Sequence, residues 1–151
     1  MSEAQPSEHV CIGRTISYGR RGDFIVFSAR GKAPDDEEWA SYVAKLKTWS
    51  EQYEMMQLLV MSDDSAPTAA QRSLFNREVA SQKMRVAAVL GSKRLLPIAK
   101  VFAWFVRSIE VFGPSDVDRA LRYLGGPPAS DVNWLFAQLG LSTGSVQGKG
   151  G

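Results

Sequence analysis

Two short polar segments carry most of the side chains that could take part in recognition or chemistry. Residues 62–68 read Ser-Asp-Asp-Ser-Ala-Pro-Thr, and residues 91–94 read Gly-Ser-Lys-Arg. Both segments follow apolar runs, which predicts that each is the turn after a buried strand. The carboxyl ends of parallel strands meet at one edge of a sheet, so we expect the two turns to lie close together. The side chains that we expect to contact a partner are Asp63, Asp64, Ser65, Thr68, Ser92, Lys93 and Arg94.

These two turns have a second interpretation. Ser, Thr and Asp are common helix caps and turn residues, and in that role they face solvent and bind nothing. Both interpretations stay open. The first segment is acidic and rich in hydroxyl groups while the second is basic, so a polar partner could contact charges of both signs at one edge.

Residues that could form a catalytic centre are few. The single histidine, His9, lies near the start of the chain, where a mobile side chain is a poor general base. The lone Cys11 has no second histidine to activate it. The sequence lacks the motifs of zinc proteases, serine hydrolases and phosphate-binding loops. We therefore predict a protein without catalytic residues, bound metal or cofactor; an enzyme would need titratable groups that converge in a deep pocket.

The composition is that of one ordinary globular domain. The chain has 151 residues, of which 44% are hydrophobic and 23% are charged, and this length supports a single core. The formal net charge of +2 is too small to indicate nucleic acid as the partner. A lone cysteine cannot form an intrachain disulfide, and the polar N-terminus does not resemble a secretion signal. The longest apolar run is shorter than the ~20 residues that span a bilayer, so we expect a cytoplasmic protein with no transmembrane segment.

The hydrophobic pattern predicts strands that alternate with helices. The expected strands cover residues 11–18, 23–29, 57–61, 85–90 and 109–112. The expected helices begin at Asp35, Thr68, Leu95, Ser115 and Asp131. The first, second and fourth of these start at a capping residue that is followed three positions later by Glu38, Gln71 or Asp118. The first two strands should form a hairpin around a turn at residues 19–23.

The order of these elements predicts an α/β fold: a mostly parallel sheet of four to five strands with an N-terminal β-hairpin, four covering helices and an extra C-terminal helix. We expect a flexible leader at residues 1–10, one folded domain at 11–125, an appended helix at 126–141 and a disordered tail at 142–151. Whether the appended helix packs on its own chain or on another is left open.

Part of this pattern resembles a known family. The run Arg-Val-Ala-Ala-Val-Leu at 85–90, an amphipathic helix, Ile-Glu-Val-Phe at 109–112 and Ala-Leu-Arg-Tyr-Leu at 120–124 are similar to the C-terminal half of the STAS superfamily. The resemblance is closest to the SpoIIAA-like relatives of the sporulation anti-sigma-factor antagonist, and it extends over residues 14–124. It implies a small cytoplasmic STAS-like domain, without catalysis, that serves regulated protein contacts; some relatives are proposed to hold apolar ligands.

The turn at residues 64–67 departs from that family. Anti-sigma-factor antagonists carry Asp-Ser-Ser-Gly there, and the second serine commonly accepts phosphate from a partner kinase. This chain reads Asp64-Ser65-Ala66-Pro67, so the usual acceptor position is Ala66. Ser65 and Thr68 are the remaining candidates for phosphorylation. A phosphate here would be favoured by the start of the following helix and opposed by the neighbouring aspartates.

A second candidate surface is apolar. In the helix expected at residues 95–108, most apolar residues share one face, but Val101 and Trp104 lie toward or beyond its edge. Phe105 and Trp134 belong to the same candidate surface. Three roles are open for these four residues: they are covered within the chain by the C-terminal helix, they form an interface with another copy of the chain, or they line a pocket for an apolar molecule. We favour the first of these.

These observations favour a non-enzymatic regulatory or scaffolding module, similar to the STAS and SpoIIAA-like domains of bacterial-type signalling, that acts through protein–protein interaction at the two turns. Its expected partner is another protein, with a second copy of the chain as a further option, and not nucleic acid. The alternative hypothesis is a carrier of an apolar or lipid-like small molecule.

Overall fold

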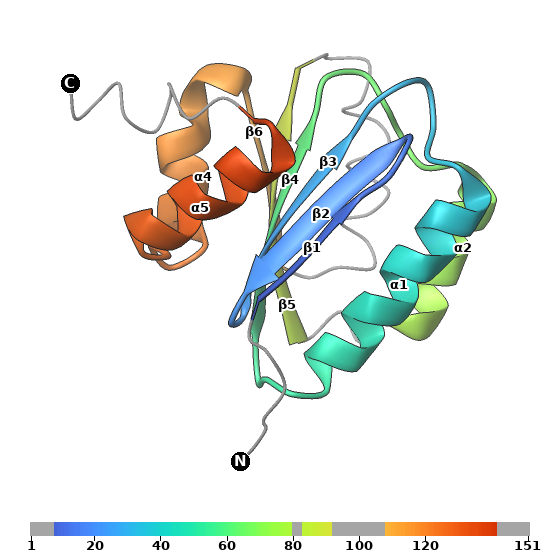
Figure 1. The fold of residues 1–151 in the computed structure, drawn as a ribbon, viewed down its shortest axis with the longest axis horizontal. Helices are drawn as coiled ribbons and strands as arrows, with labels where there is room; N and C mark the ends of the chain where they lie inside the picture. Colours follow the sequence, from blue (N-terminus) through green and yellow to red (C-terminus); the bar gives the residue numbers. More distant parts are fainter. Residues whose placement is uncertain (1–7, 80–82, 92–107, 142–151) are drawn as a thin grey trace.

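The sheet of this protein has six strands, and each strand lies next to the one that follows it in the sequence. The strands are β1 (Glu8–Ile12), β2 (Ile16–Arg21), β3 (Phe24–Ala29), β4 (Met56–Ser62), β5 (Met84–Leu90) and β6 (Ser108–Phe112). A computed structural model describes residues 8–79, 83–91 and 108–141 (Figure 1). β1, β2 and β3 pair antiparallel, whereas β3 to β6 pair parallel. This confirms the α/β class and the N-terminal antiparallel hairpin.

The expected count of four to five strands is wrong because the sheet begins earlier than the sequence indicated. β1 starts at Glu8, so residues 8–10 of the expected flexible leader belong to the sheet. The run 11–18, expected to be one strand, is divided between β1 and β2, and Cys11 pairs with Tyr18. The polar residues at the start of β1 weaken the apolar signal by which a strand is recognised.

Gly19 lies inside β2 rather than in the expected turn at residues 19–23. The chain turns only at Gly22 and Asp23. A Cβ atom at Gly19 would lie 2.9 Å from a methyl carbon of Leu135 and 3.0 Å from the carbonyl oxygen of His9. Glycine is needed here because a C-terminal helix packs closely against this strand, not because the chain must turn.

Helices α1 (Asp36–Ser50) and α2 (Ala69–Glu78) cover one face of the sheet (Figure 1). Asp35 caps α1, as expected, by accepting hydrogen bonds from two amides of its first turn. Thr68 and Gln71 form the expected capping box at the start of α2. These two helix starts could be predicted because their signals are local in the sequence.

Helices α4 (Val117–Tyr123) and α5 (Ala129–Leu139) cover the opposite face (Figure 1). The expected cap of Ser115 with Asp118 is wrong. Ser115 lies inside a short 3₁₀ helix, Pro114–Asp116, and no side-chain hydrogen bond caps α4. The 3₁₀ helix leads directly into α4, so no capping side chain is needed to begin it.

Helix α5 packs on its own chain. It contacts β1, β2 and β3, and Leu135 and Phe136 are completely buried in that contact layer. The helix at residues 126–141, expected to be appended to the domain, therefore covers the face of the N-terminal hairpin. This answers the question that the sequence left open.

The sheet separates two hydrophobic cores. Tyr18, Phe27 and Leu58 belong to the core that faces α1 and α2. Val26 and Leu59, next to Phe27 and Leu58 in the sequence, belong to the core that faces α4 and α5. The alternation follows from the pleat of a strand, which sends successive side chains to opposite faces.

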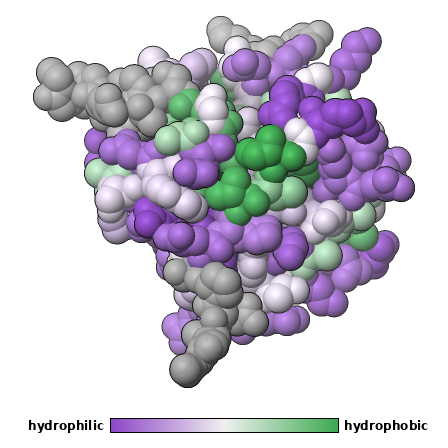
Figure 2. Space-filling view, viewed as in Figure 1, coloured by the Kyte–Doolittle hydropathy of each residue, from purple (hydrophilic) through white to green (hydrophobic). Residues whose placement is uncertain are grey.

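Most of the surface turned to the viewer in Figure 2 is hydrophilic, with one small hydrophobic patch near its centre. Ile12, at the end of β1, is 60% exposed. Within the described ranges, no helix combines the length and the hydrophobicity that crossing a membrane requires.

Several expectations concern residues outside the described ranges. They are the helix at 95–108, the tail at 142–151, and the side chains of Ser92, Lys93, Arg94, Val101, Trp104 and Phe105. Ser108, expected to be the last residue of that helix, is the first residue of β6.

Candidate functional site

The ends of β4 and β5, with Gly91 directly after β5, lie side by side, as predicted. The backbone amide of Gly91 donates a hydrogen bond of 2.8 Å to the carbonyl oxygen of Ser62. A Cβ atom at Gly91 would lie 2.7 Å from a carboxylate oxygen of Asp63 and 2.9 Å from the Asp63 Cα atom. Only glycine allows this approach, so the residue type at position 91 is part of what brings the two turns together.

The loop after β3 lies at the same edge of the sheet. The amide of Ala66, in the β4–α2 turn, donates a hydrogen bond of 3.1 Å to the carbonyl oxygen of Lys32. The side chains of Lys32, Asp63, Asp64 and Thr68 are all exposed, and we call these four residues the strand-end face. Lys32 was not among the predicted contact residues, although its position just after a buried strand is the same signal that singled out residues 62–68.

An exposed apolar side chain stands at the same edge of the sheet. Ile12 pairs with Ser17 across β1 and β2. The neighbouring Ile16 pairs with Ala29, and Ala29 pairs with Ser62 at the end of β4. A partner that spans this edge would therefore meet charged groups near β4 and an apolar group at β1.

Ser62 and Ser65 hold the β4–α2 turn in shape. The Ser62 hydroxyl donates a hydrogen bond of 2.7 Å to the carbonyl oxygen of Ser65 and accepts one of 3.1 Å from the Ser65 amide. Ser65 is only 4% exposed, so its side chain does not belong to the strand-end face. A kinase would reach the Ser65 hydroxyl only if the turn opened, whereas the exposed Thr68 hydroxyl accepts the capping hydrogen bond from the Gln71 amide.

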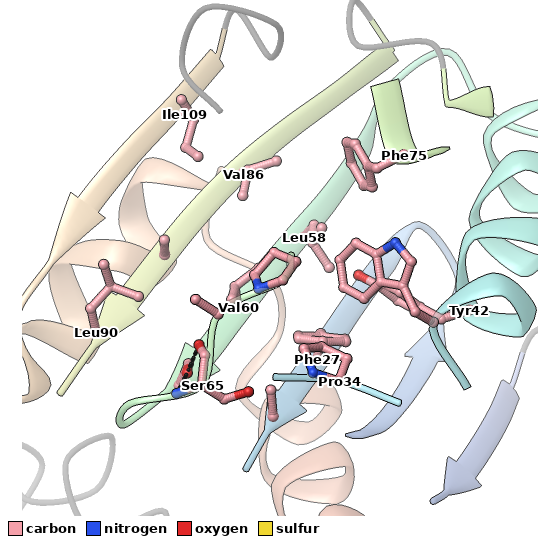
Figure 3. A pocket seen from close by; sticks show the side chains of 16 residues that line it. Phe27, Pro34, Tyr42, Leu58, Val60, Ser65, Phe75, Val86, Leu90 and Ile109 are labelled. Atoms are coloured by element: carbon pink, nitrogen blue, oxygen red, sulfur yellow. Dashed lines mark hydrogen bonds between the residues drawn. The ribbon is translucent and has the colours of Figure 1, made fainter. Parts of the chain in front are cut away.

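A cavity of about 100 Å³ lies behind this turn, between the sheet and helices α1 and α2 (Figure 3). Phe27, Leu58 and Val86 line it from three neighbouring strands, and Trp39 and Phe75 line it from the two helices. The described lining is almost entirely apolar and contains no charged side chain. Such a space is suited to a neutral apolar group.

Three alanines contribute to the described lining of the cavity. Ala29, Ala66 and Ala88 come from β3, the β4–α2 turn and β5, and all three line it. Because the space depends on residues from separate elements, the sequence does not reveal it.

Ser65 is one of the residues that line this cavity, and its hydroxyl is buried. Among the described residues that hydroxyl has no hydrogen-bond partner, and no other described residue of the lining has a buried side-chain nitrogen or oxygen atom without one. Burying a hydroxyl without a partner costs about 1–3 kcal/mol. Figure 3 places Ser65 at the end of the cavity near Pro34 and Leu90, away from Phe75.

The aromatic side chains around the cavity are neutral and held in place. Burial raises the pKa of Tyr42 well above its usual value, and the neighbouring Tyr18 raises it further. The indole nitrogen of Trp39 donates a hydrogen bond of 2.8 Å to the carbonyl oxygen of Gln71. The tryptophan is therefore fixed between α1 and α2.

His9 is packed within β1 rather than mobile, which corrects the expectation from its sequence position. Its ring centroid lies 5.4 Å from that of Trp49 and 6.3 Å from that of Tyr18. Partial burial lowers the pKa of His9, and the positive charges of Lys45 and Arg20 lower it further. This environment keeps the imidazole neutral at physiological pH.

Trp134 lies on the other side of the sheet from the cavity. The guanidinium of Arg21 lies 4.5 Å from the centroid of its ring, and Arg21 also approaches Asp131 to 3.6 Å. Trp134 is half-buried against the core formed by α4 and α5. It therefore packs within its own chain, on the face opposite α1 and α2.

In the part of the chain that the structure describes, no three His, Cys, Asp or Glu side chains lie close enough together to hold a metal ion. Comparisons of this chain with models of protein families, with curated proteins and with solved structures found no match.

Proposed function

We propose that this protein is a non-enzymatic, STAS-like regulatory or scaffolding module that binds a partner protein at the strand-end face. The observation that carries the proposal is the hydrogen bond between the Gly91 amide and the Ser62 carbonyl oxygen. It joins two turns at one edge of the sheet, where Asp63 and Asp64 are exposed. Loops held in place by a rigid sheet are common positions for binding residues.

The order of elements supports the STAS-like part of the proposal. An antiparallel hairpin leads into parallel strands β3, β4 and β5, with α1 and α2 between them, and β6 and α4 follow. The turn after β4 contains Ala66, at the position where anti-sigma-factor antagonists accept phosphate. We place the partner contact at this turn, without a phosphate at Ala66.

The charges of the strand-end face define the partner's chemistry. Asp63 and Asp64 favour a partner with basic side chains, and Lys32 favours an acidic group beside them. Exposed charge pairs of this kind chiefly change the rate of association and are screened by salt. Binding should therefore weaken as the ionic strength rises.

Charge reversal tests the proposal. The full chain with D63K and D64K, used as bait for affinity capture from its native cell, should lose the partner that the wild-type chain recovers. The matched control is E51K with E54K, which makes the same change in charge at exposed positions before β4, at the opposite end of that strand. Full recovery by the first variant, or equal loss in both, would contradict the proposal.

The cavity favours a second candidate function, the binding of a small apolar molecule. An apolar space of about 100 Å³ behind the β4–α2 turn is the observation that supports it. Native mass spectrometry of freshly purified protein should detect a bound small molecule that is lost on denaturation. No added mass from any expression host would contradict this second function and leave the first unaffected.

A further inference from the structure

We propose that two copies of this chain pair through the outer edge of β1, antiparallel and centred on Cys11, and so join their sheets into one continuous sheet. β1 is an edge strand: it pairs with β2 on one side, and no described segment pairs with it on the other (Figure 1). An edge strand presents unpaired N–H and C=O groups to any strand that can match it. This self-association is separate from the partner contact proposed for the strand-end face.

The backbone groups that face outward come from alternate residues of β1. The Gly13 amide donates a hydrogen bond of 2.8 Å to the carbonyl oxygen of Ile16, and these two residues continue the register of β1 with β2. In an antiparallel ladder, hydrogen-bonded pairs alternate with pairs whose backbone groups point away from each other. Cys11 therefore bonds to β2, whereas the amides and carbonyl oxygens of Val10 and Ile12 point outward.

Ile12 gives this open edge an apolar side chain to bury. Val10 packs on the core that faces α4 and α5, and Cys11 packs on the core of the opposite face. Because side chains alternate along a strand, Ile12 lies on the same face as Val10. Ile12 is 60% exposed, more than any other large hydrophobic side chain in the described ranges. A strand added to the edge would cover it.

The sequence of β1 matches itself in one register. Centring the pair on Cys11 places Val10 opposite Ile12 of the second copy, and Ile12 opposite its Val10, so outward backbone groups and apolar side chains meet together. The same register brings Arg14, just past the strand end, level with the oppositely charged Glu8 of the second copy. Both are exposed and already have an ion pair within their own chain, so they favour this register without dominating the affinity. A shift by two residues would instead place Ile12 opposite Glu8, or Val10 opposite Arg14.

The covering helices leave room for this pairing. α5 packs mainly on β2, and α1 also contacts β2 from the other face. Neighbouring strands are about 4.8 Å apart, so the β2 strands of the two copies would be separated by three spacings, about 14 Å. A helix with its side chains is about 10–12 Å wide. The helices of the two copies can therefore lie next to each other on each face of the joined sheet.

Sedimentation equilibrium of the full chain over a range of concentrations tests the pairing. We expect the wild-type chain to form a reversible dimer. Ile12→Lys should weaken it about tenfold or more, because the symmetric dimer loses two apolar contacts and must bury two charged side chains. The matched control, Val111→Lys, makes the same change in charge at an exposed position of β6, the other edge strand. A wild-type chain that stays monomeric at every concentration, or equal weakening by both variants, would overturn the proposal.

Ile12→Pro separates backbone pairing from a simple apolar contact. Since the Ile12 amide points away from β2, proline should remove two hydrogen bonds from the dimer and none from the monomer. Ile12→Ala also removes the apolar side chain but keeps the amide. Two hydrogen bonds predict that proline weakens the dimer about tenfold more than alanine does. Equal dimerisation of the two variants would overturn strand pairing, and an Ile12→Pro chain that circular dichroism shows to be unfolded would overturn the assignment of outward groups.

Cys11 reports the register, because it is the only cysteine of the chain. The two Cys11 residues would form a non-hydrogen-bonded pair with Cα atoms about 4.5 Å apart, a distance that a disulfide spans. Diamide, which takes up the two protons and two electrons released as the thiols join, should therefore yield a disulfide-linked dimer. Cys11→Ser with Glu51→Cys, whose thiol would be at an exposed position, should give far less at the same concentration. Equal yields would overturn the register.

A last variant keeps this proposal distinct from the one made for the strand-end face. D63K with D64K should lose the partner protein but form the Cys11 cross-link with the same yield as wild type. Loss of the cross-link in that variant would place the contact between copies at the strand-end face and overturn the pairing through β1.

Discussion

Two serines of one turn have opposite roles in this protein. The Ser62 hydroxyl makes two hydrogen bonds that hold the turn, whereas the Ser65 hydroxyl makes none with the described residues. Both look alike in the sequence, where each reads as a polar turn residue. The difference arises because the Ser62 hydroxyl lies between the amide and the carbonyl oxygen of Ser65, whereas the Ser65 hydroxyl is buried without a polar partner among the described residues.

Replacing these serines by alanine should change stability in opposite directions. Ser65→Ala removes a buried polar group without a partner and should raise the free energy of unfolding by about 1 kcal/mol. Ser62→Ala removes two hydrogen bonds and should lower it by about 1–2 kcal/mol. Urea denaturation of both variants provides the measurement. Equal destabilisation by the two changes would show that the Ser65 hydroxyl has a partner after all.

Glu38 connects α1 to the turn between β1 and β2. Its carboxylate accepts hydrogen bonds from the Thr15 hydroxyl, at 2.6 Å, and from the amides of Arg14, Thr15 and Ile16. The Thr15 hydroxyl lowers the pKa of Glu38 most, burial opposes this, and the three amides lower it further, to about 2. The Thr15 hydroxyl also accepts a hydrogen bond from the Asp35 amide. In the expected capping box, the Glu38 side chain would have accepted that hydrogen bond.

The stabilising effect of Glu38 should depend on pH. The pKa rises from about 2 in the folded state to 4.5 when unfolded, so the stabilisation is complete above 4.5 and is lost as the pH falls toward 2. Glu38→Gln should lower the free energy of unfolding by about 1–2 kcal/mol at neutral pH, a value reduced by solvent screening. The exposed Glu54→Gln serves as the control. A difference from wild type that stays constant down to about pH 3 in urea denaturation would refute this account.

At the scale of elements, the contact between the turns after β4 and β5 determines the strand-end face. Register places Ser62 opposite Leu90, so both strands end at the same level. Gly91 then allows the turns to touch. The face is therefore a property of two parallel strands and one residue without a side chain.

Gly91→Ala should disturb this contact. The added Cβ atom would lie within 3 Å of two Asp63 atoms, and relieving such overlap costs about 1–3 kcal/mol. Gly113→Ala is the control, since its φ of −83° suits alanine and the nearest atom would be 3.9 Å away. Thermal denaturation and the amide shift of residue 91 should report a change only in the first variant. A Gly91→Ala protein as stable as wild type would contradict the proposed role of the contact.

The sequence was most informative where the signal is local. The apolar runs bordered by Ser, Asp and Gly predicted β4 and β5 to within one residue at each end, and the starts of α1 and α2 followed from their caps. β1 was missed because its pairing with β2 is what makes it a strand. Gly19 was misread because its reason lies in Leu135, which comes from α5.

The candidate site was predictable in part for the same reason. Parallel strands end at one edge, so the proximity of residues 62 and 91 could be derived from the sequence. The cavity and the burial of Ser65 depend on how side chains from β3, β4, β5, α1 and α2 fill the space between them. No local pattern contains that information.

For the whole molecule, the β4–α2 turn belongs to both proposed functions. On the outside, Asp63 and Asp64 contribute to a charged face for a partner protein. On the inside, Ser65 contributes to an apolar cavity for a small molecule. Helices α4 and α5 cover the other face of the sheet.

Site-specific cross-linking tests the role of the strand-end face most directly. A photo-activatable amino acid at position 32 of the full chain, expressed in its native cell, should form a covalent adduct with a partner protein that high salt diminishes. The same amino acid at position 51, which is also exposed but lies at the opposite end of β4, should not. Adducts of equal yield at the two positions, or an adduct at position 51 alone, would contradict the account.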